Sequence, residues 1–187
     1  MSAEVNGDVD AAGLARAVLE IERHAAEAGW DQPARLFALV ETTRLAEREP
    51  QLADSLGDAA LTPIEQEGLT VGRALEDQLT GISWPGTVHG CAALVERFVL
   101  PPTVEAQLPD QPGPAATFAA EHPDRQEVRI VAAATRTGAS YCALRLRAHD
   151  EDASVLTGPD LVPGLLELVR GTLQDGPDDL HEEDTPR

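Results

Sequence analysis

The chain has 187 residues and a formal net charge of -19, from 33 acidic and 14 basic residues, and every basic residue is an arginine. This length suits one domain with its own hydrophobic core. The negative charge repels phosphate backbones, which excludes general nucleic-acid binding, and no apolar run approaches the roughly 18 residues of a membrane-spanning helix. The acidic N-terminus lacks the basic and apolar regions of a signal peptide, so we expect a cytoplasmic protein that binds no membrane.

The first part of the chain predicts a helix followed by a strand. Asp10 can cap a helix whose apolar residues recur at spacings of three and four, and Gly29 can end it. A turn that begins at Trp30 then leads into a short, mostly buried strand over residues 35–40.

Two further helices are predicted before the next strand. Thr43 can cap a short helix that Pro50 interrupts. Residues 62–65, with the sequence TPIE, match a capping box that opens a helix ending at Gly81. A turn at Trp84 precedes a long strand over residues 87–100.

The stretches WDQPARLFALVE (30–41) and WPGTVHGCAALVE (84–96) resemble each other. In each, a tryptophan at a corner follows a predicted helix and precedes a strand that ends in Ala-Leu-Val-Glu. We interpret the likeness as architectural, with the indoles closing the end of the core, and we assign no chemistry to the matching residues.

The second half of the chain predicts a hairpin. Residues 101–126 are rich in proline and glycine and predict a long loop, in which residues 115–121 have room for one helical turn. Residues 127–135 and 139–149 alternate like strands around a three-residue turn that ends at Gly138. Pairing residue 135 with residue 139 places apolar residues together on one face, and a slip of one residue would mix them with arginines. The pairs are Val128–Leu146, Ile130–Leu144 and Ala132–Cys142 on the apolar face, and Glu127–Arg147, Arg129–Arg145 and Ala133–Tyr141 on the other.

A last helix is expected after Asp160. We therefore expect a flexible N-terminus (1–9), a single α+β domain (10–174) that includes the 101–126 loop, and a disordered acidic tail (175–187). The expected fold is a mostly antiparallel sheet of about four strands flanked by helices, in the order αβααβββα.

No motif predicts catalysis, a metal or a cofactor. Cys91 and Cys142 are too few for a disulfide framework, and we expect both as reduced core residues. His89 lies two residues before Cys91, but no third residue completes a nucleophilic site. The acidic runs at 149–152 and 181–184 lack the spacing of known metal sites and are expected to be solvated charge clusters.

Arginines are concentrated in the predicted hairpin, although the chain as a whole is acidic. Five of the fourteen lie between Arg125 and Arg147, and Glu127 is the one acidic residue among them. Either Glu41 and Glu96 neutralise this sheet face, or a helix covers it, or it docks a partner with an acidic surface, which the chain's own tail could supply. The predicted partner-binding residues are Arg129, Arg145, Arg147 and Tyr141.

The runs ISWPGTVHGCAALVERFVLPP, EVRIVAAATRTGASYCALRLRAHD and GPDLVPGLL resemble an uncharacterised actinobacterial protein family of about this length. The resemblance covers most of residues 10–175. It implies lineage and a cytoplasmic location, and it transfers no activity and no functional residue.

From these features we expect a non-enzymatic binding protein, an adaptor or chaperone-like module that acts through protein contacts. The alternative is a small-molecule-binding protein or an enzyme with a pocket under the 101–126 loop. Long strands in a small sheet leave edges exposed, which predicts a homodimer.

Overall fold

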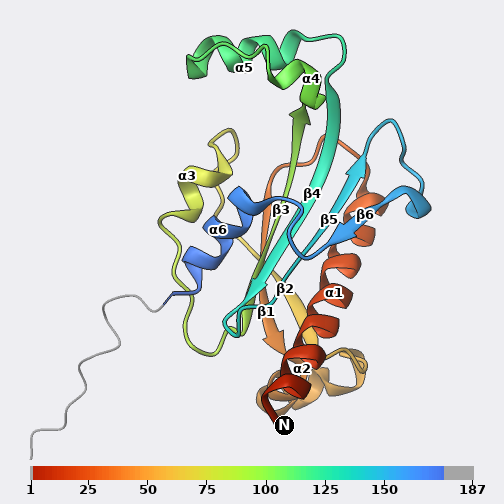
Figure 1. Ribbon diagram of the computed structural model, residues 1–187. Coiled ribbons are helices and arrows are strands. Elements are labelled where there is room, and N and C mark those ends of the chain that lie inside the picture. The colour runs from red at the N-terminus through yellow and green to blue at the C-terminus, as the bar shows by residue number, and fades with distance from the viewer. Residues whose placement is uncertain (1, 175–187) are drawn as a thin grey trace, which may run out of the picture.

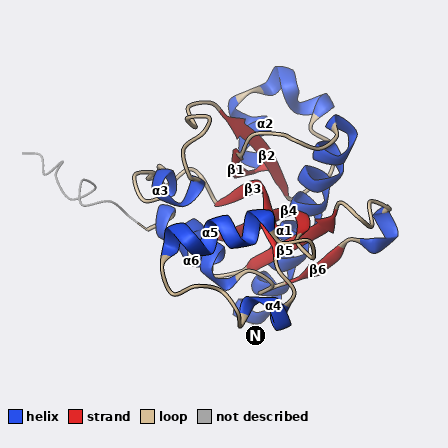
Figure 2. Ribbon diagram, turned by 90° about the horizontal axis from the view of Figure 1, so that it is seen from above, coloured by secondary structure: helices blue, strands red, loops and turns tan. Residues whose placement is uncertain are grey.

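The computed structural model describes residues 2–174, which form three layers (Figure 1). Helix α1 (Ser2–Ala28) packs on one face of a central sheet. Helices α3 (Leu75–Leu79) and α6 (Pro163–Thr172) pack on the other face, as the view along the layers also shows (Figure 2). The α+β class predicted from the sequence is confirmed.

The middle layer is a six-stranded sheet in the order β2-β1-β3-β4-β5-β6, and each neighbouring pair of strands is antiparallel. The expectation of about four strands in the order αβααβββα is therefore wrong. The strands are β1 (Arg35–Glu41), β2 (Leu61–Gln66), β3 (Gly90–Val99), β4 (Gln126–Thr135), β5 (Ser140–Leu146) and β6 (Leu156–Gly158).

Strand β2 lies where the sequence predicted the start of a helix. Pro63 lies opposite Leu39 of β1, at the edge of the sheet. A proline is accepted in an edge strand because its missing N–H can face away from the neighbouring strand. The local pattern TPIE therefore suits both a helix start and an edge strand, and pairing with β1 decides for the strand. The short helix α3 is the helical part of the predicted segment.

Strand β6 was missed because three residues are too few to show alternation. It pairs with β5 through Leu156 opposite Leu144. The four strands that were predicted are confirmed as β1, β3, β4 and β5.

The predicted register of the β4–β5 hairpin is confirmed. Val128 pairs with Leu146, Ile130 with Leu144, Ala132 with Cys142, Arg129 with Arg145, and Ala133 with Tyr141. The backbone N–H of Arg147 also donates to the carbonyl of Glu127. The apolar pairs face α6 and the arginine pair faces α1, so alternation along each strand separates the two kinds of residue.

Several helix boundaries differ from the prediction. Helix α1 begins at Ser2, so Asp10 lies within it and does not cap it. Helix α2 (Thr42–Arg48) and a 3-10 turn, η1 (Pro50–Ser55), lie on either side of Glu49, as the proline predicted. The predicted 101–126 loop contains α4 (Pro102–Glu105) and α5 (Pro112–Glu121), which lie beyond the ends of β3 and β4 (Figure 1). A second 3-10 turn, η2 (Asp152–Ser154), precedes β6.

Each face of the sheet has its own apolar core. Leu14, Val18 and Ile21 of α1 share a core with side chains of β1 to β5, and α1 runs closest to β2, β4 and β5. Leu166 and Val169 of α6 pack over the opposite face. Strand β4 is central, and its residues from 128 to 135 are all buried. Alanines 132–134 leave room for helix side chains on both sides.

The two tryptophans of the sequence echo both lie between a helix and a strand, as predicted. Trp30 stacks on Arg129, with 4.4 Å from the guanidinium carbon to the ring centroid, and its indole N–H donates to Asp150. Trp84 donates to the Thr172 hydroxyl of α6 at 3.0 Å. Each indole therefore ties the start of a strand to a distant segment.

Residues 175–187, predicted as a disordered acidic tail, lie outside the described residues, as does Met1 of the predicted flexible N-terminus. Among the helices of residues 2–174, none has both the length and the apolar character needed to cross a bilayer.

Candidate functional site

The arginine-bearing sheet face predicted as a docking surface lies beneath α1. Arg129 is fully buried and Arg145 is 2% exposed. Arg147, at the rim, exposes 42% of its side chain, and Tyr141 is partly buried against the core on the α1 side. The four predicted partner-binding residues therefore share a face of the sheet, and α1 covers much of that face.

Arg129 is neutralised within the sheet, as one of the sequence alternatives proposed. Its Nε and Nη2 donate to one oxygen of Glu96 on β3, at 3.0 and 2.7 Å. Nη2 also donates to the carbonyl of Gly29, at the end of α1. Nη1 has no hydrogen-bond partner in the described part of the chain.

Arg145 is neutralised by α1 and by the segment after β5. Its Nε and Nη2 donate to the carboxylate of Glu22 at 2.6 and 2.9 Å, and Nη2 also donates to Asp152 at 2.7 Å. Nη1 donates to the carbonyl of Asp150 at 2.7 Å. These hydrogen bonds, above all those to Glu22, raise the pKa of the Arg145 guanidinium, against the opposing effect of burial.

Arg147 is paired with two carboxylates at the edge of the same region. It donates to both oxygens of Asp31 at 2.9 and 3.0 Å and to Glu127 at 2.8 Å. The hydrogen bonds from Arg147 lower the pKa of Asp31. These arginines already have anionic partners, and α1 covers much of their face. Docking of an acidic protein on this face stays a prediction, and it would require α1 to move.

His89 and Cys91 are not brought together. Cys91 is buried in the core on the α6 side. His89 lies just before β3, and its side chain bonds to Asp10 of α1, on the other side of the sheet from Cys91. Burial raises the pKa of the Cys91 thiol to about 11, despite weaker opposing hydrogen bonds from Thr172 and Trp84. A thiol with so high a pKa is a poor nucleophile.

The acidic run at 149–152 has a structural role. Asp150 and Asp152 bind Arg145, and within residues 2–174 no three His, Cys, Asp or Glu side chains are grouped as metal ligands. The run at 181–184 lies outside the described residues.

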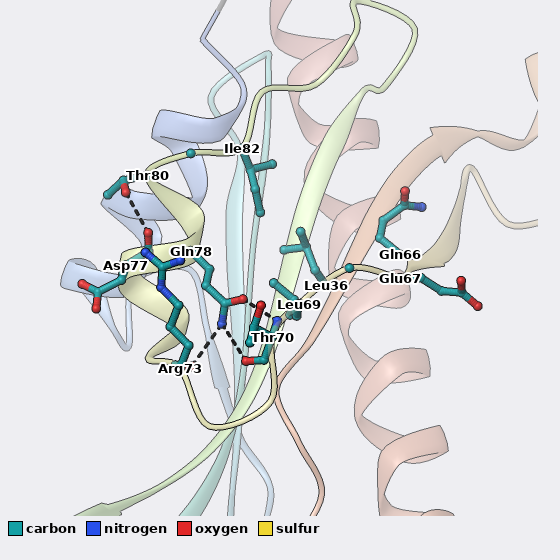
Figure 3. Close-up of a pocket in the computed structure, with 12 residues that line it drawn as sticks. Leu36, Gln66, Glu67, Leu69, Thr70, Arg73, Asp77, Gln78, Thr80 and Ile82 are labelled. Carbon is teal, nitrogen blue, oxygen red and sulfur yellow. Dashed lines mark hydrogen bonds between the residues drawn. The ribbon is translucent and has the colours of Figure 1, made fainter.

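An open pocket of about 470 Å³ lies between β1 and the loop that leads to α3 (Figure 3). Leu36, Leu69 and Ile82 form its apolar part. The Gln78 side chain accepts from the backbone N–H of Thr70 at 2.6 Å and donates to the Thr70 carbonyl at 3.3 Å. Gln78 therefore holds the loop, and its amide is already engaged. A pocket under the 101–126 loop stays a prediction.

Four leucines line the open edge of the sheet on the α6 side, and we name them the leucine edge: Leu144, Leu146, Leu156 and Leu161. Leu144 and Leu146 alternate onto this face of β5, and Leu156 of β6 lies opposite Leu144. Leu161 packs close to Gly158, at the end of β6. Leu156 is 58% exposed and Leu161 40% exposed. Helix α6 lies over β3 and β4, so it leaves this edge uncovered (Figure 1).

Sequence reasoning placed Leu144 and Leu146 on the apolar face of the hairpin but missed the exposed edge. Val155-Leu156-Thr157 has a β-favouring composition and ends at Gly158-Pro159, but the run is too short to show alternation, so composition was the one local hint of β6. The exposure of Leu156 depends on where α6 packs, and that information is not local.

The family model described as PPA1309-like protein matches residues 14–174 of the chain. The match covers nearly the same residues as the family resemblance found in the sequence, which spans most of residues 10–175. Neither the curated proteins nor the solved structures contained a match to the chain.

Proposed function

The chain belongs to the PPA1309-like protein family, and we propose that it is a non-enzymatic cytoplasmic binding protein, an adaptor or chaperone-like module that holds a partner protein at the leucine edge. The observation that carries the proposal is the pair of exposed leucines, Leu156 and Leu161, beside two leucines that the core covers only in part. Contiguous exposed apolar surface is a feature of interaction sites.

The leucine edge can supply the apolar contribution of a modest interface. Full burial of a leucine side chain contributes about 1.5–3 kcal/mol. Leu156 and Leu161 are each about half exposed, so together they contribute roughly 1.5–3 kcal/mol when covered. The neighbouring Asp160 is exposed and the chain carries a net charge of -19, so the fitting partner has apolar side chains and a neutral or basic rim.

A homodimer, which the sequence predicts, is proposed on this same edge. The sequence-based reason for a dimer was that long strands leave exposed edges. That reason does not hold, because the two ten-residue strands β3 and β4 are central and the edge strands β2 and β6 are shorter. A second copy packed across β6 would cover the leucine edges of both copies, against the repulsion of two acidic chains.

A cytoplasmic location is supported by the two cysteines. Both are buried free thiols, which is the usual state of cysteine in a reducing compartment.

The test compares the variant Leu156→Glu/Leu161→Glu with Leu52→Glu, a control at a leucine in η1 that is as exposed as Leu161. Tagged proteins are returned to their source cells, crosslinked and purified, and the captured proteins are identified. A partner at the leucine edge should be captured by the wild type and by the Leu52 variant and be lost from the double variant. Unchanged capture by the double variant would exclude this surface.

Light scattering on the same three proteins tests the homodimer. A dimer that forms in the wild type and in the Leu52→Glu variant, and dissociates in the double variant, identifies a second copy as the occupant. A wild type that stays monomeric at high concentration excludes it.

The alternative function, a small-molecule binder or enzyme, has a separate test. A ligand bound under residues 101–126 should slow amide hydrogen exchange in α4 and α5 and leave exchange at the leucine edge unchanged.

A further inference from the structure

A second pocket, of about 300 Å³, lies at the opposite end of the sheet from α5 and is lined by segments that are far apart in the sequence. Its polar lining comes from Asp10 of α1, Glu41 at the end of β1, His89 before β3 and Thr137 in the β4–β5 turn. Ala60 and Leu61, at the start of β2, provide an apolar wall. Five separate segments therefore converge on one small cavity.

Hydrogen bonds around Asp10 assign the proton on His89. The Asp10 carboxylate accepts from the Thr135 and Thr137 hydroxyls and lies 2.7 Å from His89 Nε2. Burial alone would raise the pKa of Asp10, but hydrogen bonds from Thr137, His89 and Thr135 outweigh it and lower the pKa below 3.8. An ionised carboxylate can only accept, so His89 Nε2 carries the hydrogen.

The other ring nitrogen of His89 faces a second acceptor. Its Nδ1 lies 3.5 Å from Glu41 Oε1. That separation is much longer than the 2.7–2.9 Å of a charge-assisted N–H···O bond. When the ring is neutral, Nδ1 has a lone pair and no hydrogen, so two acceptors face each other with no donor between them, whereas a hydrogen on Nδ1 would point at Glu41.

The other contacts of Glu41 leave this oxygen open to the pocket. Arg44 pairs with Glu41 Oε2 at 2.5 Å, and its side chain is 64% exposed. Arg44 therefore balances one of the two carboxylates, and with a neutral His89 ring the second negative charge, that of Asp10, remains. A ligand that supplies hydrogen-bond donors and a positive charge would satisfy both the acceptors and the charge.

We propose that this pocket binds a small primary ammonium ligand, whose charged group donates to His89 Nδ1 and Glu41 Oε1 and whose short alkyl part packs on Ala60 and Leu61. An ammonium group has three donors and no acceptor. The Thr137 hydroxyl donates its hydrogen to Asp10 and lies 2.8 Å from the Thr135 hydroxyl, and a free lone pair on its oxygen can accept the third donor. This site is separate from the leucine edge, and the proposal does not rest on that function.

The test uses n-butylammonium chloride as the probe and n-butanol and butyrate as controls of similar size. The titrations are followed by NMR of the His89 ring nitrogens at about pH 8, above the ordinary histidine pKa. The expected result is a saturable change at His89 Nδ1 with n-butylammonium, at least about tenfold tighter than any change with n-butanol. Butyrate should cause no change.

Two variants identify the site. Glu41→Gln keeps the size of the side chain and removes its charge, so the dissociation constant for n-butylammonium should rise about tenfold or more. Glu47→Gln, at an exposed position of the neighbouring helix α2, should leave it unchanged. Equal binding of n-butanol, no saturable change at His89, or an unchanged dissociation constant in Glu41→Gln would each overturn the proposal.

Discussion

The buried ion pair between Arg145 and Glu22 provides the sharpest test of the physical account of the sheet. Arg145 on β5 and Glu22 on α1 are 2% and 4% exposed at their side chains, with a closest approach of 2.6 Å. The substitution Arg145→Ala removes the cation and leaves the Glu22 carboxylate buried without its partner.

The size of the expected effect follows from what remains unpaired. Breaking a buried pair by removing one partner costs about 3–5 kcal/mol, because the other charge stays buried without compensation. A domain of this size has a free energy of unfolding of about 5–15 kcal/mol, so Arg145→Ala should lose about a fifth or more of it. Asp152 also loses a partner but is 85% exposed, so water replaces that bond.

Replacing both partners should have a different effect. In Glu22→Leu/Arg145→Met no charge is left buried, and such replacements are often neutral or stabilising by about 1–4 kcal/mol. The double variant should therefore be more stable than Arg145→Ala, even though it carries two substitutions and Arg145→Ala carries one.

The assay is urea unfolding followed by circular dichroism, with the slope of the transition checked for constancy. Arg16→Ala is the matched control, since Arg16 makes an ion pair with Asp58 in which the two side chains are 58% and 89% exposed. That variant should show no measurable loss. A loss from Arg145→Ala below about 1 kcal/mol, or a double variant less stable than Arg145→Ala, would refute the reasoning.

Three further predictions concern other positions. Because burial raises the pKa of the Cys91 thiol to about 11, the native protein should not react with a thiol reagent at about pH 8, and both thiols should react after unfolding. Gly90→Ala would place a Cβ 2.6 Å from the Ala134 carbonyl and should cost about 1–3 kcal/mol in urea unfolding, whereas Gly171→Ala in α6 meets no atom within 4 Å and should gain about 0.5–1 kcal/mol. The lowered pKa of Asp10 stabilises the folded protein fully above the unfolded-chain value of 3.8, and this contribution is lost as the pH falls through the lower folded-state pKa, so the stability difference between wild type and Asp10→Asn should shrink at acid pH. An equal difference at pH values on both sides of 3.8 would contradict it.

Parts of the fold were predictable because their signals are local. The β4–β5 register followed from residues on one hairpin, since a slip would bury arginines among leucines, and Val128 does lie opposite Leu146. The helix predicted from residue 62 failed for the same kind of reason, because Pro63 and Glu65 suit both a helix start and an edge strand. No local pattern shows that β1 lies beside this segment, and pairing with β1 makes the segment a strand.

The candidate sites were less predictable than the fold. Arg129 and Arg145 were recognised as an unusual pair, and Glu96 was named as a neutralising residue, which is confirmed. Glu41 was named with it, but Glu41 lies near His89 instead. The cluster of Asp10 and His89 joins residues that are 79 positions apart, and a single sequence carries no signal for such a pairing.

The α+β class, four of the strands, the hairpin register and the two faces of the central strands could be predicted from the sequence, because each depends on side chains within one local segment. Which face is exposed became evident in the three-dimensional packing. The sequence placed Arg129 and Arg145 on one face and Leu144 and Leu146 on the other, but α1 covers the arginines while α6 stops short of the leucines. Burial depends on how the helices pack over the sheet. The predicted docking surface required an exposed arginine face and a buried apolar face, but the charged face is buried and an apolar edge is exposed.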